Sequence, residues 1–253
     1  MKGRSLMTAL QNIRKNKPVI HCITNYVTAN FQANALLALG ASPIMADLAD
    51  EVTEVTSFAD ALVLNFGTLQ QHSELAMTRA GQKANERGIP VVIDPVGVGA
   101  IRSRLAMCQR LLQVVNPTAF RLNAGELAAI AGEQWEARGV DAGSGEANVQ
   151  EMARFVAEKY DAIVVVTGAT DLVVSARQMF EITGGDPWMK QVTGAGCVLT
   201  TIVAAFATVN TDAETIQQGV RFYKKVAEQA RQAATGIGQF QVECLNYLQM
   251  EEL

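Results

Sequence analysis

Short apolar runs alternate with longer amphipathic stretches over most of this chain. The runs are rich in Val, Ile and Leu and nearly continuous, which is typical of strands buried on both faces of a parallel sheet. Because such a sheet needs helices on both sides, the alternation predicts an α/β fold with a mostly parallel central sheet. The expected strands span residues 19–23, 43–46, 61–65, 90–93, 119–122 and 162–167, and the helices between them span 29–39, 50–58, 73–87, 101–112, 126–131 and 149–159.

The last third of the chain departs from this alternation. No internal repeat, low-complexity tract or Pro/Ser-rich linker interrupts the sequence, so one domain over residues 1–253 is the simplest assignment. A hairpin and a series of helices are expected at the end of the chain. The hairpin spans 172–175 and 178–183, and the helices run from Gly194 onward, over 211–234 and over 240–248.

Composition and charge exclude several classes of protein. Apolar residues make up 49% and charged residues 18% of the 253, which predicts a substantial core and no extensive disorder. The net charge is −4 and no Lys/Arg run occurs, so a nucleic-acid partner is not expected. The N-terminus reads as an amphipathic helix and not as a signal peptide, and the longest apolar stretch, 198–209, is too short to span a membrane.

Cysteine and histidine usage argues for a reduced protein without structural zinc. The four cysteines form no CxxC motif, and His21 and His72 are the only histidines. Both histidines are interpreted as structural or surface residues. Together with the absence of a targeting or membrane segment, these features predict a cytoplasmic protein.

Each expected parallel strand runs into a cluster of polar residues and glycines. In an open parallel sheet, ligands bind beyond the carboxyl ends of the strands. Ordinary turns explain some of the clusters, but their succession at one edge indicates a binding site. The clusters are Thr24-Asn25, Met45-Ala46-Asp47, Asn65-Phe66-Gly67-Thr68, Asp94-Pro95-Val96-Gly97, Asn123-Ala124-Gly125-Glu126 and Thr167-Gly168.

Gly194-Ala195-Gly196 opens an apolar helix and is a candidate anion site. Glycines permit close backbone approach, and the free amides of a helix N-terminus attract anions. Such a site can stabilise the charge on a phosphoryl group during transfer. A tight turn followed by a helix start explains the same residues equally well.

Asn123-x-x-Glu126 follows a strand that contains Arg121. A carboxylate near phosphates can hold Mg²⁺ directly or through water, and a guanidinium suits phosphate oxygens. Taken alone, a helix N-cap at Asn123 with Glu126 in the first turn is the favoured alternative. Asp94 has the same ambiguity, as a turn carboxylate or a second acidic group near the metal.

These motifs and their surroundings resemble the hydroxyethylthiazole kinase family of the ribokinase-like superfamily. The superfamily motifs are the Gly-Ala-Gly at 194–196 and the Asn-x-x-Glu at 123–126. The family-level resemblance runs in order from about residue 19 to 209. Its blocks are ITNYV at 23–27 with Asn30 and Asn34, GASPIM at 40–45, NFGT at 65–68, DPVGVGA at 94–100, RLNAGE at 121–126, Thr167-Gly168 and VTGAGC at 192–197.

The resemblance implies a ribokinase-like fold and a reaction. The reaction is ATP- and Mg²⁺-dependent phosphorylation of the hydroxyl of 4-methyl-5-(2-hydroxyethyl)thiazole, in thiamine biosynthesis. By resemblance, Arg121 and Thr167 contact ATP, Asp94 and Glu126 organise Mg²⁺, and the protein is a homo-oligomer, typically a trimer. The thiazole would meet Met45 and Gly194, with Asn25 and Gly67 lining the same pocket.

Cys197 departs from the superfamily pattern. Most ribokinase-like kinases carry Asp after the Gly-Ala-Gly triplet as the base for the substrate hydroxyl, and the thiazole kinase branch shares the cysteine. A positioned base is worth about 10²–10⁴-fold, whereas phosphoryl transfer depends more on positioning and electrostatics. The sequence therefore predicts a slow kinase, in which Cys197 is either a partly ionised thiol or a small apolar filler.

Four other functions compete with this interpretation. A pyrimidine-alcohol kinase or a nucleotide-repair dehydratase would keep the fold, but Met45 and Cys197 argue against both. A catalytically silent precursor-binding protein would not need the phosphate- and metal-type groups. A nicotinamide-dependent dehydrogenase is disfavoured because no GxGxxG follows the first strand.

Overall fold

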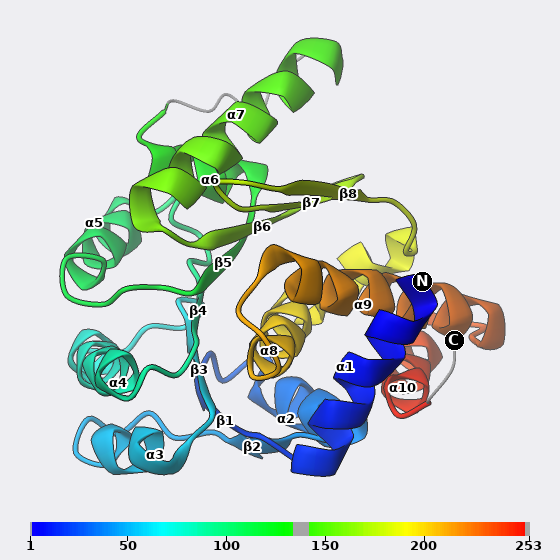
Figure 1. The fold of residues 1–253 in the computed structure, drawn as a ribbon, viewed down its shortest axis with the longest axis horizontal. Helices are drawn as coiled ribbons and strands as arrows, with labels where there is room; N and C mark the ends of the chain where they lie inside the picture. Colours follow the sequence, from blue (N-terminus) through cyan, green and yellow to red (C-terminus); the bar gives the residue numbers. More distant parts are fainter. Residues whose placement is uncertain (1, 134–141, 251–253) are drawn as a thin grey trace.

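A computed structural model describes residues 2–133 and 142–250 of the chain. Within these residues, one eight-stranded sheet has the order β2-β1-β3-β4-β5-β6-β7-β8 (Figure 1). The strands from β2 to β6 in this order are parallel. Strand β7 pairs antiparallel with β6, and β8 pairs antiparallel with β7. This arrangement confirms the predicted α/β class. The bounds are β1 Val19–Ile23, β2 Ser42–Ile44, β3 Ala61–Asn65, β4 Val91–Asp94, β5 Ala119–Asn123, β6 Ile163–Thr167, β7 Asp171–Val174 and β8 Met179–Ile182.

Helices cover both faces of the sheet, as the apolar strands require (Figure 1). The helices α3 to α7 lie on one face, and α1, α2, α8, α9 and α10 lie on the other. The first group spans α3 Val52–Phe58, α4 Ser73–Arg87, α5 Arg102–Leu111, α6 Ala124–Ala131 and α7 Ala142–Tyr160. The second spans α1 Lys2–Asn16, α2 Ala29–Leu39, α8 Ala195–Ala207, α9 Ala213–Ala233 and α10 Ile237–Leu248, with the short 3₁₀ helix η1 Pro187–Gln191 before α8.

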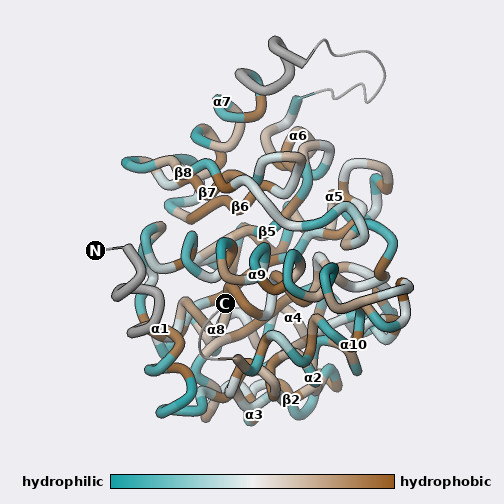
Figure 2. Tube along the Cα trace, turned by 90° about the vertical axis from the view of Figure 1, so that its right-hand side faces the viewer, coloured by the Kyte–Doolittle hydropathy of each residue, from teal (hydrophilic) through white to brown (hydrophobic). Residues whose placement is uncertain are grey.

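The strands divide their side chains between two apolar cores. Along β3, Ala61 and Val63 face the core around α8, whereas Leu62 and Leu64 face the core under α3 to α7. The tube in Figure 2 is brown along β6 and β7, and the helices carry alternating teal and brown segments. Helix α8 is buried along most of its length, which places its N-terminus inside the molecule.

Most of the elements have their predicted bounds within two residues, but three do not. Helix α10 begins at Ile237 instead of residue 240. Helix α7 begins at Ala142 instead of residue 149, because the poor helix formers Gly143, Ser144 and Gly145 hide its first turns in the sequence. The helix η1 was not predicted, since Pro187 after paired glycines is typical of a loop. No helix in the described residues is long and apolar enough to cross a membrane. The assignment of one domain to residues 1–253 stays a prediction.

His21 lies on β1 and is fully buried beneath α3. Its Nδ1 is 2.9 Å from the Thr56 hydroxyl and its Nε2 is 2.8 Å from the Ala46 carbonyl. Burial lowers the pKa of His21 below its usual value of 6.5, while the Ala46 carbonyl and the charge of Glu51 act in the opposite direction. The imidazole is therefore neutral at pH 7, with its proton on the nitrogen that faces the carbonyl.

The pKa of His21 predicts a loss of stability at mildly acidic pH. As the pH falls below 6.5, His21 is protonated in the unfolded chain, whereas in the folded chain it is protonated only at a lower pH. The free energy of unfolding therefore falls as the pH drops from 7. One proton corresponds to a slope of at most about 1.4 kcal/mol per pH unit. Urea unfolding between pH 7 and 5 should show a shallower slope for His21→Gln. Equal slopes in both proteins would contradict the prediction.

Candidate active site

Asp94 ends β4 and its side chain has no exposed surface. Its Oδ2 accepts hydrogen bonds from Asn65 Nδ2 at 2.8 Å and from the Thr200 hydroxyl at 2.7 Å. Asn65 ends β3 and Thr200 lies on α8, so the carboxylate joins two strand ends to the buried helix. The predicted cluster at residue 94 is thus the centre of a side-chain network at the carboxyl edge of the sheet.

The other oxygen of Asp94 lacks a hydrogen-bond partner. Asp94 Oδ1 is 3.5 Å from Nη1 of Arg121, and both this oxygen and Arg121 Nε are buried and unpaired. Burial raises the pKa of Asp94, and Arg121 opposes that shift. Because buried polar atoms are almost always paired in folded proteins, these two atoms are suited to be completed by a ligand or an ion.

Glu126 and Asn123 form the helix cap that the sequence left open as an alternative. The Asn123 side chain accepts from the Glu126 amide, and Glu126 Oε2 accepts from the Asn123 amide, both at 2.9 Å. Glu126 Oε1 accepts from the Gly97 amide at 2.9 Å. Burial raises the pKa of Glu126. Each oxygen keeps a further lone pair, so the cap does not exclude a role near a metal, which stays a prediction.

The acidic groups at this edge fit Mg²⁺ better than a metal that requires a full set of protein ligands. Among the residues that the structure describes, no group of three or more His, Cys, Asp and Glu side chains is placed to hold a metal. Mg²⁺ keeps several waters and takes one or two carboxylates together with substrate phosphates. The unpaired Oδ1 of Asp94 offers one such ligand, and Glu126 can act through water.

Two glycines at the start of α8 are required by close contacts. Gly194 has φ +93°, and a Cβ there would lie 2.7 Å from Thr28 Cγ2. A Cβ on Gly196 would lie 2.5 Å from Arg121 Nη2. The helix N-terminus therefore packs directly on the guanidinium, and its first-turn amides provide an anion site next to a fixed positive charge.

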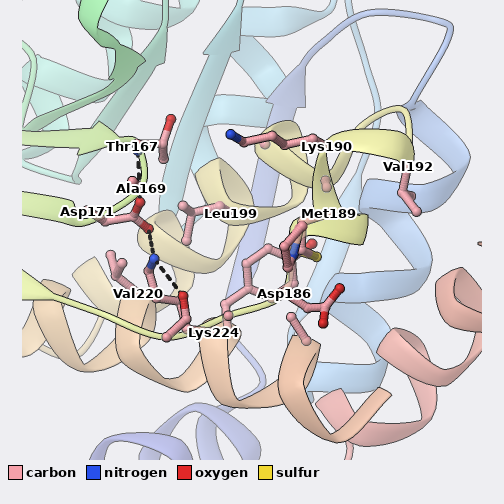
Figure 3. Close-up of a pocket in the computed structure, with 18 of the residues that line it drawn as sticks. Thr167, Ala169, Asp171, Asp186, Met189, Lys190, Val192, Leu199, Val220 and Lys224 are labelled. Atoms are coloured by element: carbon pink, nitrogen blue, oxygen red, sulfur yellow. Dashed lines mark hydrogen bonds and ion pairs between the residues drawn. The ribbon is translucent and has the colours of Figure 1, made fainter. Parts of the chain in front are cut away.

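A cavity of about 750 Å³ opens beside this helix N-terminus. Arg121 and Thr167 line it, and Arg121 Nη2 donates to the Thr167 hydroxyl at 3.0 Å. The predicted residues Gly194, Ala195 and Gly196 also line the cavity, between η1, the end of β6 and α9 (Figure 3). The other predicted residues do not line it: Asn25, Met45, Gly67, Asp94, Glu126 and Cys197.

Two lysines of this cavity were not singled out in the sequence. Lys224 is 3.3 Å from Asp171 Oδ2 and donates to the Gly184 carbonyl at 3.1 Å, while Asp171 Oδ1 accepts from the Gly168 amide. In Figure 3, Lys190 extends across the cavity with its ammonium toward Thr167. The position of Lys190, four residues before the Gly-Ala-Gly triplet, could have indicated a role beside the helix N-terminus. Because η1 was not predicted, the direction of the Lys190 side chain could not be inferred.

Cys197 lies on the other side of the helix N-terminus, among side-chain amides. Its Sγ is 3.3 Å from Asn65 Nδ2 and 3.5 Å from Asn25 Nδ2. Asn65 Oδ1 in turn accepts from Asn25 Nδ2 and from the Gly67 amide, each at 2.9 Å. Burial and then the Asp94 charge raise the pKa of Cys197, so the thiol is neutral near pH 7. Of the two interpretations of Cys197, the geometry disfavours an ionised base.

Met45 follows β2 and stands apart from this amide cluster. Its surface is 36% exposed, and other apolar side chains after β1 and β2 are exposed too. Asn25 and Gly67 lie in the cluster around Cys197, since a Cβ on Gly67 would be 2.6 Å from the Asn25 Cβ. The structure therefore brings Asn25, Gly67 and Cys197 together, and Met45 is partly exposed outside this cluster.

A mostly parallel sheet, a glycine-opened helix N-terminus at its carboxyl edge and a cavity beside the buried Arg121–Asp94 pair are the features of a ribokinase-like fold. A solved ribokinase-like superfamily protein from Enterococcus faecalis shares the fold, with a TM-score of 0.69 at 15% identity. That comparison covers 97% of this chain and 95% of the other.

The chain belongs to the hydroxyethylthiazole kinase family, because a model of that family matches residues 10–252. Hydroxyethylthiazole kinase of Lysinibacillus sphaericus is 45% identical over 239 residues, which are 94% of each protein. The solved structure of a hydroxyethylthiazole kinase protein from Pyrococcus horikoshii has a TM-score of 0.89 at 34% identity, over 97% of this chain and 93% of that one. The family resemblance inferred from the motifs is confirmed.

The contact between Gly196 and Arg121 predicts a steric effect on kinase activity. In Gly196→Ala the new methyl group must displace the guanidinium, and a shift of about 1 Å at a reacting centre costs roughly 100-fold in rate. We expect kcat/KM to fall by about that factor while the melting temperature changes little. Gly238→Ala, whose Cβ meets nothing within 4 Å, is the matched control. Wild-type activity in Gly196→Ala would contradict the prediction.

Proposed function

We propose that this chain transfers the γ-phosphoryl group of ATP to the hydroxyl of 4-methyl-5-(2-hydroxyethyl)thiazole, with Mg²⁺, in thiamine biosynthesis. The observation that carries the proposal is the buried Arg121–Asp94 pair beneath the α8 N-terminus, in a chain of the hydroxyethylthiazole kinase family. This arrangement provides fixed positive charge and free amides where a phosphoryl group gains negative charge in the transition state.

The nucleotide would occupy the cavity beside α8. Its phosphates would meet Arg121, Thr167 and the amides at the start of α8, and Lys190 supplies a further positive charge from η1. The Lys224–Asp171 ion pair would hold the strand end at Gly168 against the loop at Gly184. ATP fits these groups because a triphosphate needs several donors along its length.

The thiazole would bind on the opposite side of the α8 N-terminus. Asn25, Gly67 and Gly194 would line its pocket, with Met45 at the rim and Cys197 beneath the hydroxyl. The hydroxyl oxygen attacks the γ-phosphorus, the bond to the bridging oxygen of ADP breaks, and Arg121 and the helix amides stabilise the charge on the transferred group. A neutral Cys197 would pack beside the substrate without accepting a proton. In the loose transition state the hydroxyl proton would leave late and pass to an oxygen of the transferred phosphoryl group.

Asp94 and Glu126 are the residues that would hold Mg²⁺. When bound, the ion neutralises charge shared by the β- and γ-phosphates. Asp94 would do so through its unpaired Oδ1, and Glu126 through water because its oxygens already accept backbone amides.

The proposed assembly is a homo-oligomer, a trimer, working in the cytoplasm. Exposed apolar side chains after β1 and β2 support an interface beside the thiazole pocket, since contiguous exposed apolar surface often marks contacts between subunits. The free thiols of all four cysteines support a reducing compartment. The exposed side chains are Tyr26 at 75%, Val27 at 58%, Leu48 at 55% and Met45 at 36%.

Thiazole-dependent release of ADP by the purified protein with MgATP tests the function. We expect turnover with hydroxyethylthiazole and none with hydroxymethylpyrimidine or ribose, because the proposed site would place the thiazole beside Met45 and Cys197. Turnover with hydroxymethylpyrimidine alone would replace the substrate and keep the fold. No turnover with any of the three alcohols, despite thiazole binding, would favour the silent binding protein.

Substitution of Cys197 tests whether the thiol is needed. Cys197→Ser should keep measurable turnover, since a neutral thiol supplies no base. Cys197→Asp should be faster, because the amides of Asn25 and Asn65 can hold a carboxylate there and a positioned base is worth up to about 10²–10⁴-fold. Steady-state kcat at saturating thiazole measures both effects. Complete loss of activity in the Ser variant, with thiazole binding intact, would refute this role.

A further inference from the structure

The loop between β2 and α3 carries Met45, which the proposed function places at the rim of the thiazole pocket. Two side chains hold this loop by its carbonyls. Nε2 of the buried His21 is 2.8 Å from the Ala46 carbonyl, and Nη1 of Arg79 donates to the Ala49 carbonyl at 2.8 Å. Ala46 is itself buried, whereas Arg79 is partly exposed. Because Ala46 is buried, water cannot replace the hydrogen bond between His21 and the Ala46 carbonyl.

The hydrogen bonds around His21 fix which nitrogen carries its proton. A carbonyl only accepts, so Nε2 must donate to Ala46. In the neutral ring Nδ1 is then an acceptor, and the Thr56 hydroxyl, 2.9 Å away, donates to it. The Thr56 hydroxyl also donates to the Val52 carbonyl at 2.7 Å, so this carbonyl and His21 Nδ1 share its one proton. The imidazole of His21 on β1 is thus hydrogen-bonded both to Thr56 on α3 and to Ala46, the loop residue next to Met45.

We propose that His21 is a positioning residue for the thiazole pocket, acting on Met45 through the Ala46 carbonyl without touching the substrate. If the imidazole is lost, the carbonyl is left buried without a donor, and a buried unsatisfied acceptor is costly. The chain at residue 46 then moves to reach another donor or water. Met45 is one peptide away, so its side chain moves with it.

The effect should fall on one substrate only. His21 lies on β1, whereas Arg121 and Thr167 of the nucleotide cavity lie on β5 and β6, with β3 and β4 between them. The Ala46 carbonyl belongs to neither the cavity nor the Asp94 network. A positioning role therefore predicts a change in thiazole affinity without a change in ATP affinity. General loosening of the fold would change both.

His21→Leu and His21→Gln separate the hydrogen bond from packing. Leucine fills the space without a donor, and we expect the KM for hydroxyethylthiazole to rise about tenfold while the KM for ATP stays within about twofold. The side-chain amide of glutamine can donate to Ala46, so His21→Gln should return the thiazole KM to within about threefold of wild type. This rescue depends on the donor and not on the volume of the side chain.

Cys22→Ala is the matched control, because Cys22 is buried on the same strand but faces the opposite core. It should leave both KM values unchanged. An unchanged thiazole KM in folded His21→Leu, an equal rise of both KM values, or a thiazole effect in Cys22→Ala would overturn the proposal. If His21→Leu does not fold, Thr56→Val replaces it and should raise the thiazole KM alone, by about threefold, and no rise would overturn the proposal.

This inference rests on the proposed thiazole site, and calorimetry separates the two. Titration of each variant with hydroxyethylthiazole reads the affinity without turnover. Wild-type protein that binds the thiazole but does not phosphorylate it would refute the proposed reaction, and a tenfold weaker Kd in His21→Leu would still support the positioning role. Wild-type protein that does not bind the thiazole would overturn both.

Discussion

The burial of the Asp94 carboxylate is the constraint on which the site depends. A carboxylate without exposed surface is tolerated only where donors and positive charge surround it. Asn65 from β3, Thr200 from α8 and Arg121 from β5 meet this requirement. Three strand ends and a helix N-terminus are therefore held together by one side chain, and the hydrogen bonds continue from Asn65 to Asn25.

The α8 N-terminus divides the edge of the sheet into two environments. On one side, Arg121 and Thr167 face a cavity with further positive charge from Lys190. On the other, Cys197 lies among neutral side-chain amides that carry no net charge. Under the proposed function, the charged phosphoryl donor and the uncharged acceptor would occupy separate sides of the first turn of α8. The two sides differ in charge because Arg121 and Thr167 lie on β5 and β6, whereas Asn25 and Asn65 follow or end β1 and β3.

The fold could be predicted from the sequence because its signals are local. The apolar strands β1 and β3 end at polar residues and glycines, and their predicted bounds are those observed. The pairing within the site has no local signal. Asp94 meets Asn65 and Thr200 across 29 and 106 residues of sequence, and only the sheet order brings them together. His21 is a buried residue, as the structural alternative had it, but its partners on α3 and on the loop after β2 had no local signal.

The packing of Gly196 on Arg121 and of Gly194 on Thr28 limits how this site can diverge. A side chain at Gly194 would collide with Thr28, and one at Gly196 would collide with Arg121, unless that neighbour moves or is replaced by a smaller residue. The residues of each pair are therefore expected to change together. Under the proposed function, loss of Arg121 would weaken phosphate binding, and a side chain at Gly196 would displace the guanidinium and weaken it as well. Each single step would therefore pass through a less active protein. The glycines of the triplet are therefore expected to change only together with Arg121 or Thr28.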